Sequence, residues 1–90
     1  MARVVVSAVG GLVDPALPDI KGLQSFGGEL FHTARWNHGY ELGGKRVGVI
    51  GTGASAVQVV PSIAPQVLRL AVFQRTPAWV VPKHDKRYSE

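Results

Sequence analysis

The sequence contains no cysteine, few aromatic residues (8%) and no apolar segment long enough to cross a bilayer. Without cysteine, disulfide bonds, thiolate catalysis and thiolate zinc sites are excluded. A membrane-spanning helix needs about 20 predominantly apolar residues, and residues 1–11 lack the long apolar stretch of a secretory signal. We therefore expect no membrane partner and a cytoplasmic location.

Acidic residues are also scarce, with six Asp and Glu against ten Lys and Arg, which gives a net charge of +4. The basic residues are scattered singly along the chain except at residues 82–87, and they form no basic stripe in the sequence. We therefore expect no nucleic-acid partner. Binding of a small anion such as a phosphate needs only one or two of these charges, so the sequence is compatible with such a ligand.

The sequence has enough apolar residues to form the core of one small domain. Of the 90 residues, 46% are hydrophobic and 18% are charged, which is typical of globular chains. The apolar run at residues 46–51 is nearly continuous, as in a parallel strand buried on both faces. Predicted strands cover residues 3–9, 46–51, 68–75 and 78–82.

Helical spacing begins after the second of these strands. Ala54, Val57 and Ala64 recur on one helix face, with Val60 or Pro61 between them. Proline in a helix interior costs about 3 kcal/mol or more, so this helix must kink at Pro61 or be short. The remaining segments are a predicted helical turn or more at residues 29–36, predicted loops at 11–28 and 37–45, a turn at 76–77 and an open, solvated end at 83–90.

The glycine-rich stretch Gly-Thr-Gly-Ala-Ser-Ala at residues 51–56 joins the predicted strand to the predicted helix. Its spacing is G-x-G-x-x-A, the pattern of a dinucleotide-binding βαβ unit. Gly51 allows a tight turn, Gly53 lets a pyrophosphate approach the backbone, and Ala56 lets the helix pack close to the sheet. The first amides of the helix then face the phosphates. Because a strand, a helix and a second strand surround the motif, nucleotide binding is favoured over a merely tight connection.

The end of the following strand indicates which nucleotide is bound. Sites for NAD usually place Asp or Glu there, whereas an arginine accommodates the 2′-phosphate of NADP. This chain has Arg75 and Thr76 at that place, and no acid lies between Arg69 and His84. The sequence thus predicts NADP(H) over NAD(H), the alternative being that Arg75 is an ordinary exposed cation at a strand end.

A second pattern precedes the glycine loop. Phe26, Gly28, His32 and Trp36 fit F-x-G-x-x-x-H-x-x-x-W, which resembles the fingerprint of Baeyer–Villiger monooxygenases in the flavin-containing monooxygenase superfamily. The segments at residues 47–61, including Pro61, and at residues 72–82 also resemble that family. Related N- and S-oxidising enzymes usually have Tyr at the place of Trp36. Two residues depart from the family pattern: Asn37 stands where Pro or Asp is usual, and Val9 where Thr is frequent.

The resemblance implies an α/β fold, in which residues 45–90 are a Rossmann-like βαβ unit of an NADP-binding domain. Residues 1–44 would be an interdomain strand, loop and fingerprint segment from the junction with an FAD domain. In such enzymes NADPH reduces FAD, and the reduced flavin uses molecular oxygen to convert a ketone into an ester or lactone. The implied cofactor-binding residues are Gly51, Thr52, Gly53, Ala54, Ser55, Ala56, Val57 and Gln58 around the pyrophosphate, and Arg75 and Thr76 at the 2′-phosphate.

No catalytic residue is assigned within this chain, and His32 and Trp36 would belong to a linker that couples domain movement to catalysis. The residues themselves allow His32 to be a structural, hydrogen-bonded histidine, and no metal site is expected because His38 and His84 lie in unrelated loops. No FAD-binding motif precedes residue 51, so we expect a fragment that is inactive without its parent enzyme. The alternatives are a stand-alone NADP-binding module and a fragment of an N- or S-oxidising monooxygenase.

Overall fold

The computed structural model describes residues 2–82, and the chain divides into two compact units, Met1–Tyr40 and Glu41–Glu90. Each unit is described by itself. The first contains two short 3-10 helices, η1 (Leu23–Ser25) and η2 (Thr33–Arg35), joined by loops. Of the predicted helical turn at residues 29–36, only Thr33–Arg35 (η2) is helical, and η1 is an additional turn within the predicted loop at residues 11–28.

The strand predicted at residues 3–9 is wrong. This segment has no strand structure, and the side chains of Val4, Val5 and Val6 are 77%, 86% and 84% exposed. A strand exists only through hydrogen bonds to a neighbouring strand, and within residues 2–82 this segment has no such neighbour. β-branched composition alone therefore did not make a strand here.

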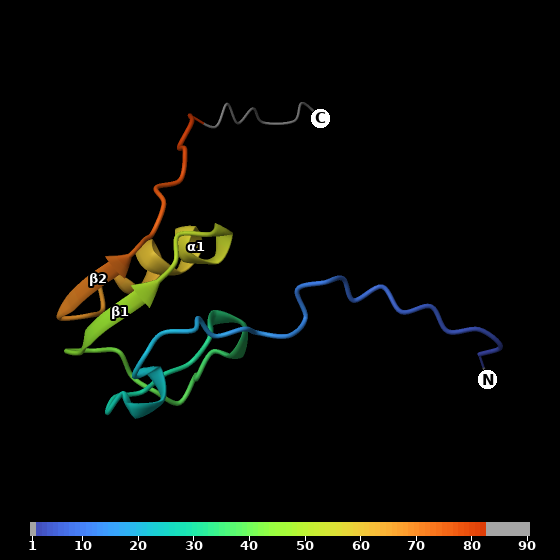
Figure 1. Cartoon of the computed structure of the whole chain (residues 1–90), viewed down its shortest axis with the longest axis horizontal. Helices are drawn as coiled ribbons and strands as arrows, with labels where there is room; N and C mark the ends of the chain where they lie inside the picture. The colour runs from blue at the N-terminus through green and yellow to red at the C-terminus, as the bar shows by residue number, and fades with distance from the viewer. Residues whose placement is uncertain (1, 83–90) are drawn as a thin grey trace, which may run out of the picture. The chain divides into compact units, whose positions relative to one another are not determined.

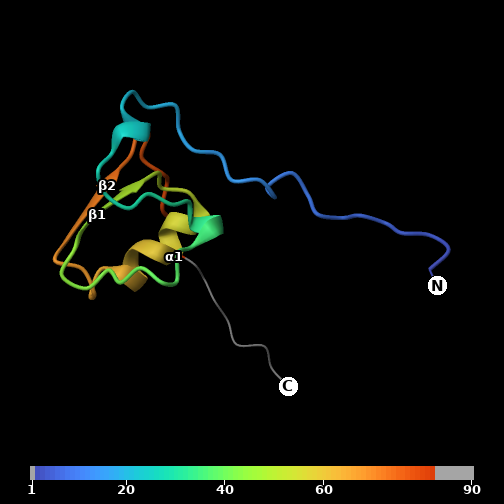
Figure 2. The same cartoon turned by 90° about the horizontal axis from the view of Figure 1, so that it is seen from below.

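The second unit is a βαβ arrangement, which Figures 1 and 2 show from two sides. Strand β1 (Arg46–Ile50) leads into helix α1 (Ala54–Ile63), which leads into strand β2 (Arg69–Phe73). The two strands pair in parallel, with Arg46 opposite Arg69 and Ile50 opposite Phe73. The predicted α/β class and the order of strand, helix and strand are confirmed.

Burial in this unit is shallow. Ile63 of α1 is the one buried hydrophobic residue among residues 2–82, at 4% exposure. Along β1, Val47 and Val49 are half-buried, whereas Arg46, Gly48 and Ile50 are exposed. The prediction that this strand is buried on both faces is therefore wrong for this chain, because a single helix can cover only one face of a sheet.

Pro61 lies inside α1 rather than at its end. The helix has ten residues and stops two residues after the proline, at Ile63. Proline lacks the amide hydrogen that would bond to the carbonyl four residues earlier. That carbonyl belongs to Val57. Separately, the hydroxyl of Ser62 donates to the Gln58 carbonyl at 2.7 Å, and the Ala64 amide closes the helix on the Val60 carbonyl at 3.0 Å. The sequence predicted a kink at Pro61 or a short helix, and the observed helix extends for only two residues beyond the proline.

The end of the described chain is irregular. A bend at Arg75 and Thr76 follows β2, close to the predicted turn, but the strand predicted at residues 78–82 is wrong. Trp79 in this segment is 99% exposed and lies in no strand. The predicted open end at residues 83–90 falls outside the described residues. Over the part of the chain that is described, the structure has no helix with the length and apolar character needed for a membrane crossing.

Candidate nucleotide-binding site

The turn between β1 and α1 is fixed by one backbone hydrogen bond and one positive dihedral angle. The Gly51 amide donates to the Phe73 carbonyl at 2.9 Å, which extends the pairing of the two strands by one residue. Gly51 has φ +106°, a conformation that side chains with a Cβ rarely adopt. The backbone can therefore leave the sheet sharply at this point only because residue 51 is glycine.

Gly53 begins α1 and leaves the space in front of the helix open. It is the N-cap residue, in an extended conformation (φ −69°, ψ −178°), and no side chain caps the helix. Its carbonyl accepts the first helical hydrogen bond, from the Val57 amide at 3.1 Å. A Cβ placed on Gly53 would meet no atom within 4 Å. The first amides of the helix have no acceptor within the helix, and among residues 2–82 no neighbouring atom fills the position that a side chain at Gly53 would take.

The other predicted residues of the turn and the first helical turns differ in exposure. Thr52 and Ala56 are half-buried. Ala54, Ser55, Val57 and Gln58 are exposed. The side-chain amide of Gln58 donates to the Ala54 carbonyl at 3.3 Å, so this side chain is bonded to its own helix.

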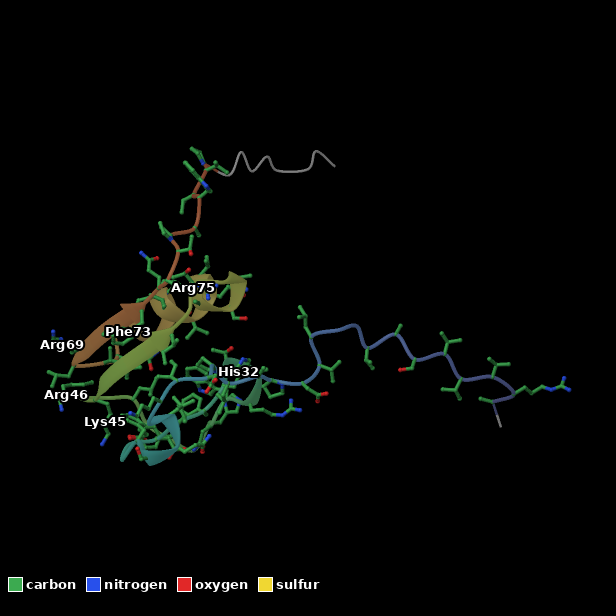
Figure 3. The ribbon with its side chains drawn as sticks, in the orientation of Figure 1. His32, Lys45, Arg46, Arg69, Phe73 and Arg75 are labelled. Atoms are coloured by element: carbon green, nitrogen blue, oxygen red, sulfur yellow. The ribbon has the colours of Figure 1, made fainter. Side chains whose placement is uncertain are left out.

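Arg75 and Thr76 follow the carboxyl end of β2, at the same edge of the sheet as the glycine turn. The Phe73 carbonyl that accepts from Gly51 lies only two residues before Arg75. Arg75 is exposed, and Figure 3 shows it at the end of the sheet opposite to Lys45, Arg46 and Arg69. The structure therefore brings the glycine turn and Arg75 to one edge, although they are far apart in the sequence.

The fingerprint residues lie in the first unit, where side-chain contacts organise them. The ring of Phe26 lies over Gly28, since a Cβ on Gly28 would come within 2.7 Å of a ring carbon. Trp36 packs edge-on against Phe31, with ring centroids 5.0 Å apart and an interplanar angle of 75°. Phe31 was not among the predicted residues, and its only mark in the sequence is that it is an aromatic residue inside the fingerprint.

His32 caps η2. Its Nδ1 atom accepts a hydrogen bond from the Ala34 amide at 3.0 Å, and its own carbonyl accepts from the Arg35 amide at 2.8 Å. An accepting Nδ1 requires that the proton of the neutral imidazole sits on Nε2. His32 is thus a hydrogen-bonded histidine that supports the local backbone, which is the structural role that the sequence allowed for it. His84, the other histidine weighed as a partner, lies outside the described residues.

Asn37 closes the fingerprint through two hydrogen bonds. Its Nδ2 atom donates to Oε1 of Glu29 at 2.8 Å, and its Oδ1 atom accepts from the Gly39 amide at 3.1 Å. An aspartate, which is usual in the resembled pattern, would set a second carboxylate against Glu29. The amide at position 37 is therefore matched to the acid at position 29, a pairing that the sequence reading missed.

Comparison with known proteins gives consistent matches over almost the whole chain. The family model described as "Flavin-binding monooxygenase-like" matches residues 2–89. A protein named Baeyer-Villiger monooxygenase from Streptomyces coelicolor is 62% identical over 88 residues, and one of the same name from Pseudomonas aeruginosa is 55% identical over 89 residues. These alignments cover 98% and 99% of this chain and 17% of each relative.

A solved structure is also similar. The closed crystal structure of cyclohexanone monooxygenase matches with a TM-score of 0.74 and 52% identity, covering 83% of this chain and 14% of that chain. The chain therefore spans about one-sixth of the length of its curated relatives. The family model covers nearly every residue and the relatives are more than half identical, so the chain belongs to the flavin-binding monooxygenase-like family.

Proposed function

We propose that residues 45–90 form a Rossmann-like βαβ unit that binds NADP(H) in an FAD- and NADPH-dependent Baeyer–Villiger monooxygenase. This proposal rests on one observation: the open, uncapped start of α1 and Arg75 lie at the same edge of the sheet. Backbone amides that lack hydrogen-bond acceptors at the start of a helix can bind a pyrophosphate. A guanidinium beyond the next parallel strand suits the additional phosphate of NADP.

The residues of this chain would bind and orient the nicotinamide cofactor, and they would not themselves catalyse the making or breaking of covalent bonds. The pyrophosphate would lie on the amides that follow Gly53, a residue at which a Cβ would meet no atom within 4 Å. Arg75 and Thr76 would hold the 2′-phosphate. FAD, bound mainly by other parts of the parent protein, supplies the chemistry by which molecular oxygen is used. The names of the similar proteins support a ketone as the substrate of the parent.

The preference for NADPH over NADH is tested by the variant Arg75→Ala. We expect NADPH affinity, measured by calorimetry, to fall about 10- to 100-fold while NADH affinity stays nearly constant, because only NADPH carries the phosphate that Arg75 holds. Arg46→Ala removes the same charge at the opposite edge of the sheet and serves as the matched control. Equal losses for both nucleotides, or an equal loss in the control variant, would contradict the assignment of Arg75.

The reaction class is tested on the complete parent protein. Incubation with NADPH, oxygen and a cyclic ketone is expected to yield a lactone, identified by mass spectrometry. Formation of only N- or S-oxides from amine or sulfide substrates would support the alternative monooxygenase class. NADPH binding by the parent without consumption of oxygen would support a binding module without catalysis.

A further inference from the structure

Three cationic residues gather at the amino-terminal edge of the sheet, and we call Lys45, Arg46 and Arg69 the basic edge. Arg46 and Arg69 are the first residues of β1 and β2 and are partners in the parallel register. The Lys45 carbonyl accepts from the amides of Leu68 and Arg69, at 2.9 and 3.3 Å, which holds Lys45 beside the start of β2. All three cations are exposed, and Figure 3 shows them at the end of the sheet away from Arg75.

The arrangement is electrostatically unfavourable by itself. Register partners in neighbouring strands lie about 4.8 Å apart and point to the same face, and like charges placed opposite each other destabilise a sheet. Lys45 adds a third positive charge next to this pair. An anionic group bound at this edge would reduce the repulsion and supply acceptors for the guanidinium groups.

We propose that the basic edge is a docking surface for an acidic segment of a polypeptide. The arginine guanidinium group binds a carboxylate in a bidentate geometry, and two arginines side by side can bind neighbouring Asp or Glu residues. The adjacent Leu68 side chain is 74% exposed and offers apolar contact area that a protein partner can cover. A nucleic acid would instead require cations spread along its backbone, whereas these charges occupy one end of the sheet.

This surface is separate from the proposed nucleotide-binding site. The strands are parallel, so their amino ends share one edge, and the glycine turn with Arg75 lies at the other. A partner at the basic edge therefore leaves the approach to Gly53 open. Binding of an acidic segment at the basic edge therefore does not depend on NADP(H) binding at the other edge.

The test measures binding of a hexaglutamate peptide with blocked ends to the 90-residue chain by calorimetry at low salt. The variant Lys45→Gln/Arg46→Gln/Arg69→Gln is compared with Arg3→Gln/Lys21→Gln/Arg35→Gln, which removes the same charge from other exposed positions. We expect peptide affinity to fall at least about fivefold in the first variant and less than about twofold in the second. Binding to the unchanged protein should be lost in about 0.5 M sodium chloride.

Three results would overturn the proposal: no binding of the peptide to the unchanged protein, equal losses in the two triple variants, or tighter binding of a short DNA duplex than of the peptide. A single variant separates docking from structural damage. Arg69→Gln removes the repulsion between register partners, so it should raise the melting temperature while it weakens peptide binding. A fall of both quantities would show that the loss of binding comes from a damaged fold and would contradict the proposal.

Discussion

The glycine turn at residues 51–53 and the fingerprint at residues 26–37 are built by opposite means. In the glycine turn the absence of side chains matters: Gly51 has a positive φ, and the space at Gly53 is open. In the fingerprint, side chains make the structure, through the Phe31–Trp36 pair and the Asn37–Glu29 hydrogen bond. An added side chain should therefore strain the backbone at Gly51 and obstruct a ligand at Gly53, whereas removed side chains should damage the fingerprint.

The largest effect is expected from Gly51→Val, which tests the turn itself. A β-branched residue at φ +106° is strained by about 1–3 kcal/mol, a large share of the stability of a small domain. We expect a lower melting temperature and a loss of NADPH binding by more than about 100-fold. The matched control is Gly43→Val, at a turn with no positive φ and with open space. Equal melting temperatures for the two variants would contradict the role of the turn.

Gly53→Val separates binding from folding. Because the extended backbone of Gly53 is accessible to any residue and a Cβ meets no atom within 4 Å, the melting temperature should fall less than in Gly51→Val, by the roughly 0.5–1 kcal/mol that a poor N-cap residue costs. The valine side chain would, however, occupy the space proposed for the pyrophosphate, and NADPH affinity should fall about 100-fold. Calorimetry combined with thermal unfolding measures both quantities. Unchanged NADPH affinity in this variant would place the nucleotide elsewhere.

A smaller effect is expected from Trp36→Ala in the fingerprint. Loss of the edge-on contact with Phe31 should lower stability by about 1 kcal/mol, while NADPH affinity stays the same. Trp79, which is 99% exposed, provides the control, because Trp79→Ala should leave stability unchanged. Urea unfolding followed by circular dichroism measures both variants. Equal stabilities would show that the aromatic pair does not organise the fingerprint.

The smallest effect is expected from Asn37→Asp. The change replaces the hydrogen bond to Glu29 by two facing carboxylates and should cost about 0.5 kcal/mol at this solvent-accessible position. Adding Glu29→Gln to the same variant restores a donor opposite a carboxylate and should recover the loss. The four proteins of this double-mutant cycle are compared by urea unfolding. Additive effects would mean that residues 29 and 37 do not interact in solution.

Local patterns in the sequence were sufficient for the βαβ unit. The apolar runs of β1 and β2, the helical spacing of α1 and the glycines between them each act over a few residues, and the structure has all three elements in the predicted order. The strands predicted at residues 3–9 and 78–82 failed because strand formation depends on a partner, which composition does not supply. Burial of β1 on both faces failed for a different reason: it depends on a covering layer on each face of the sheet, and within residues 2–82 a single α-helix is present.

The candidate site was predictable in part. Spacing placed Gly51 and Gly53 at the turn, and parallel pairing then places Arg75 at the same edge. The contacts of Phe31 and Glu29 could not be predicted, because they depend on how loops fold back on themselves rather than on a periodic pattern. The basic edge was missed because Arg46 and Arg69 are distant in the sequence and meet only through the register of the sheet.

The proposed contact of NADPH with the glycine turn and Arg75 is tested directly by an NADPH titration followed through the amide resonances of the 90-residue protein. We predict saturable shifts concentrated at Gly53, Ala54, Ser55 and Arg75, with the resonances of Arg46 and Arg69 at the opposite edge nearly unchanged. Saturable shifts centred on the opposite edge, or a folded protein whose resonances do not respond to NADPH, would contradict the account.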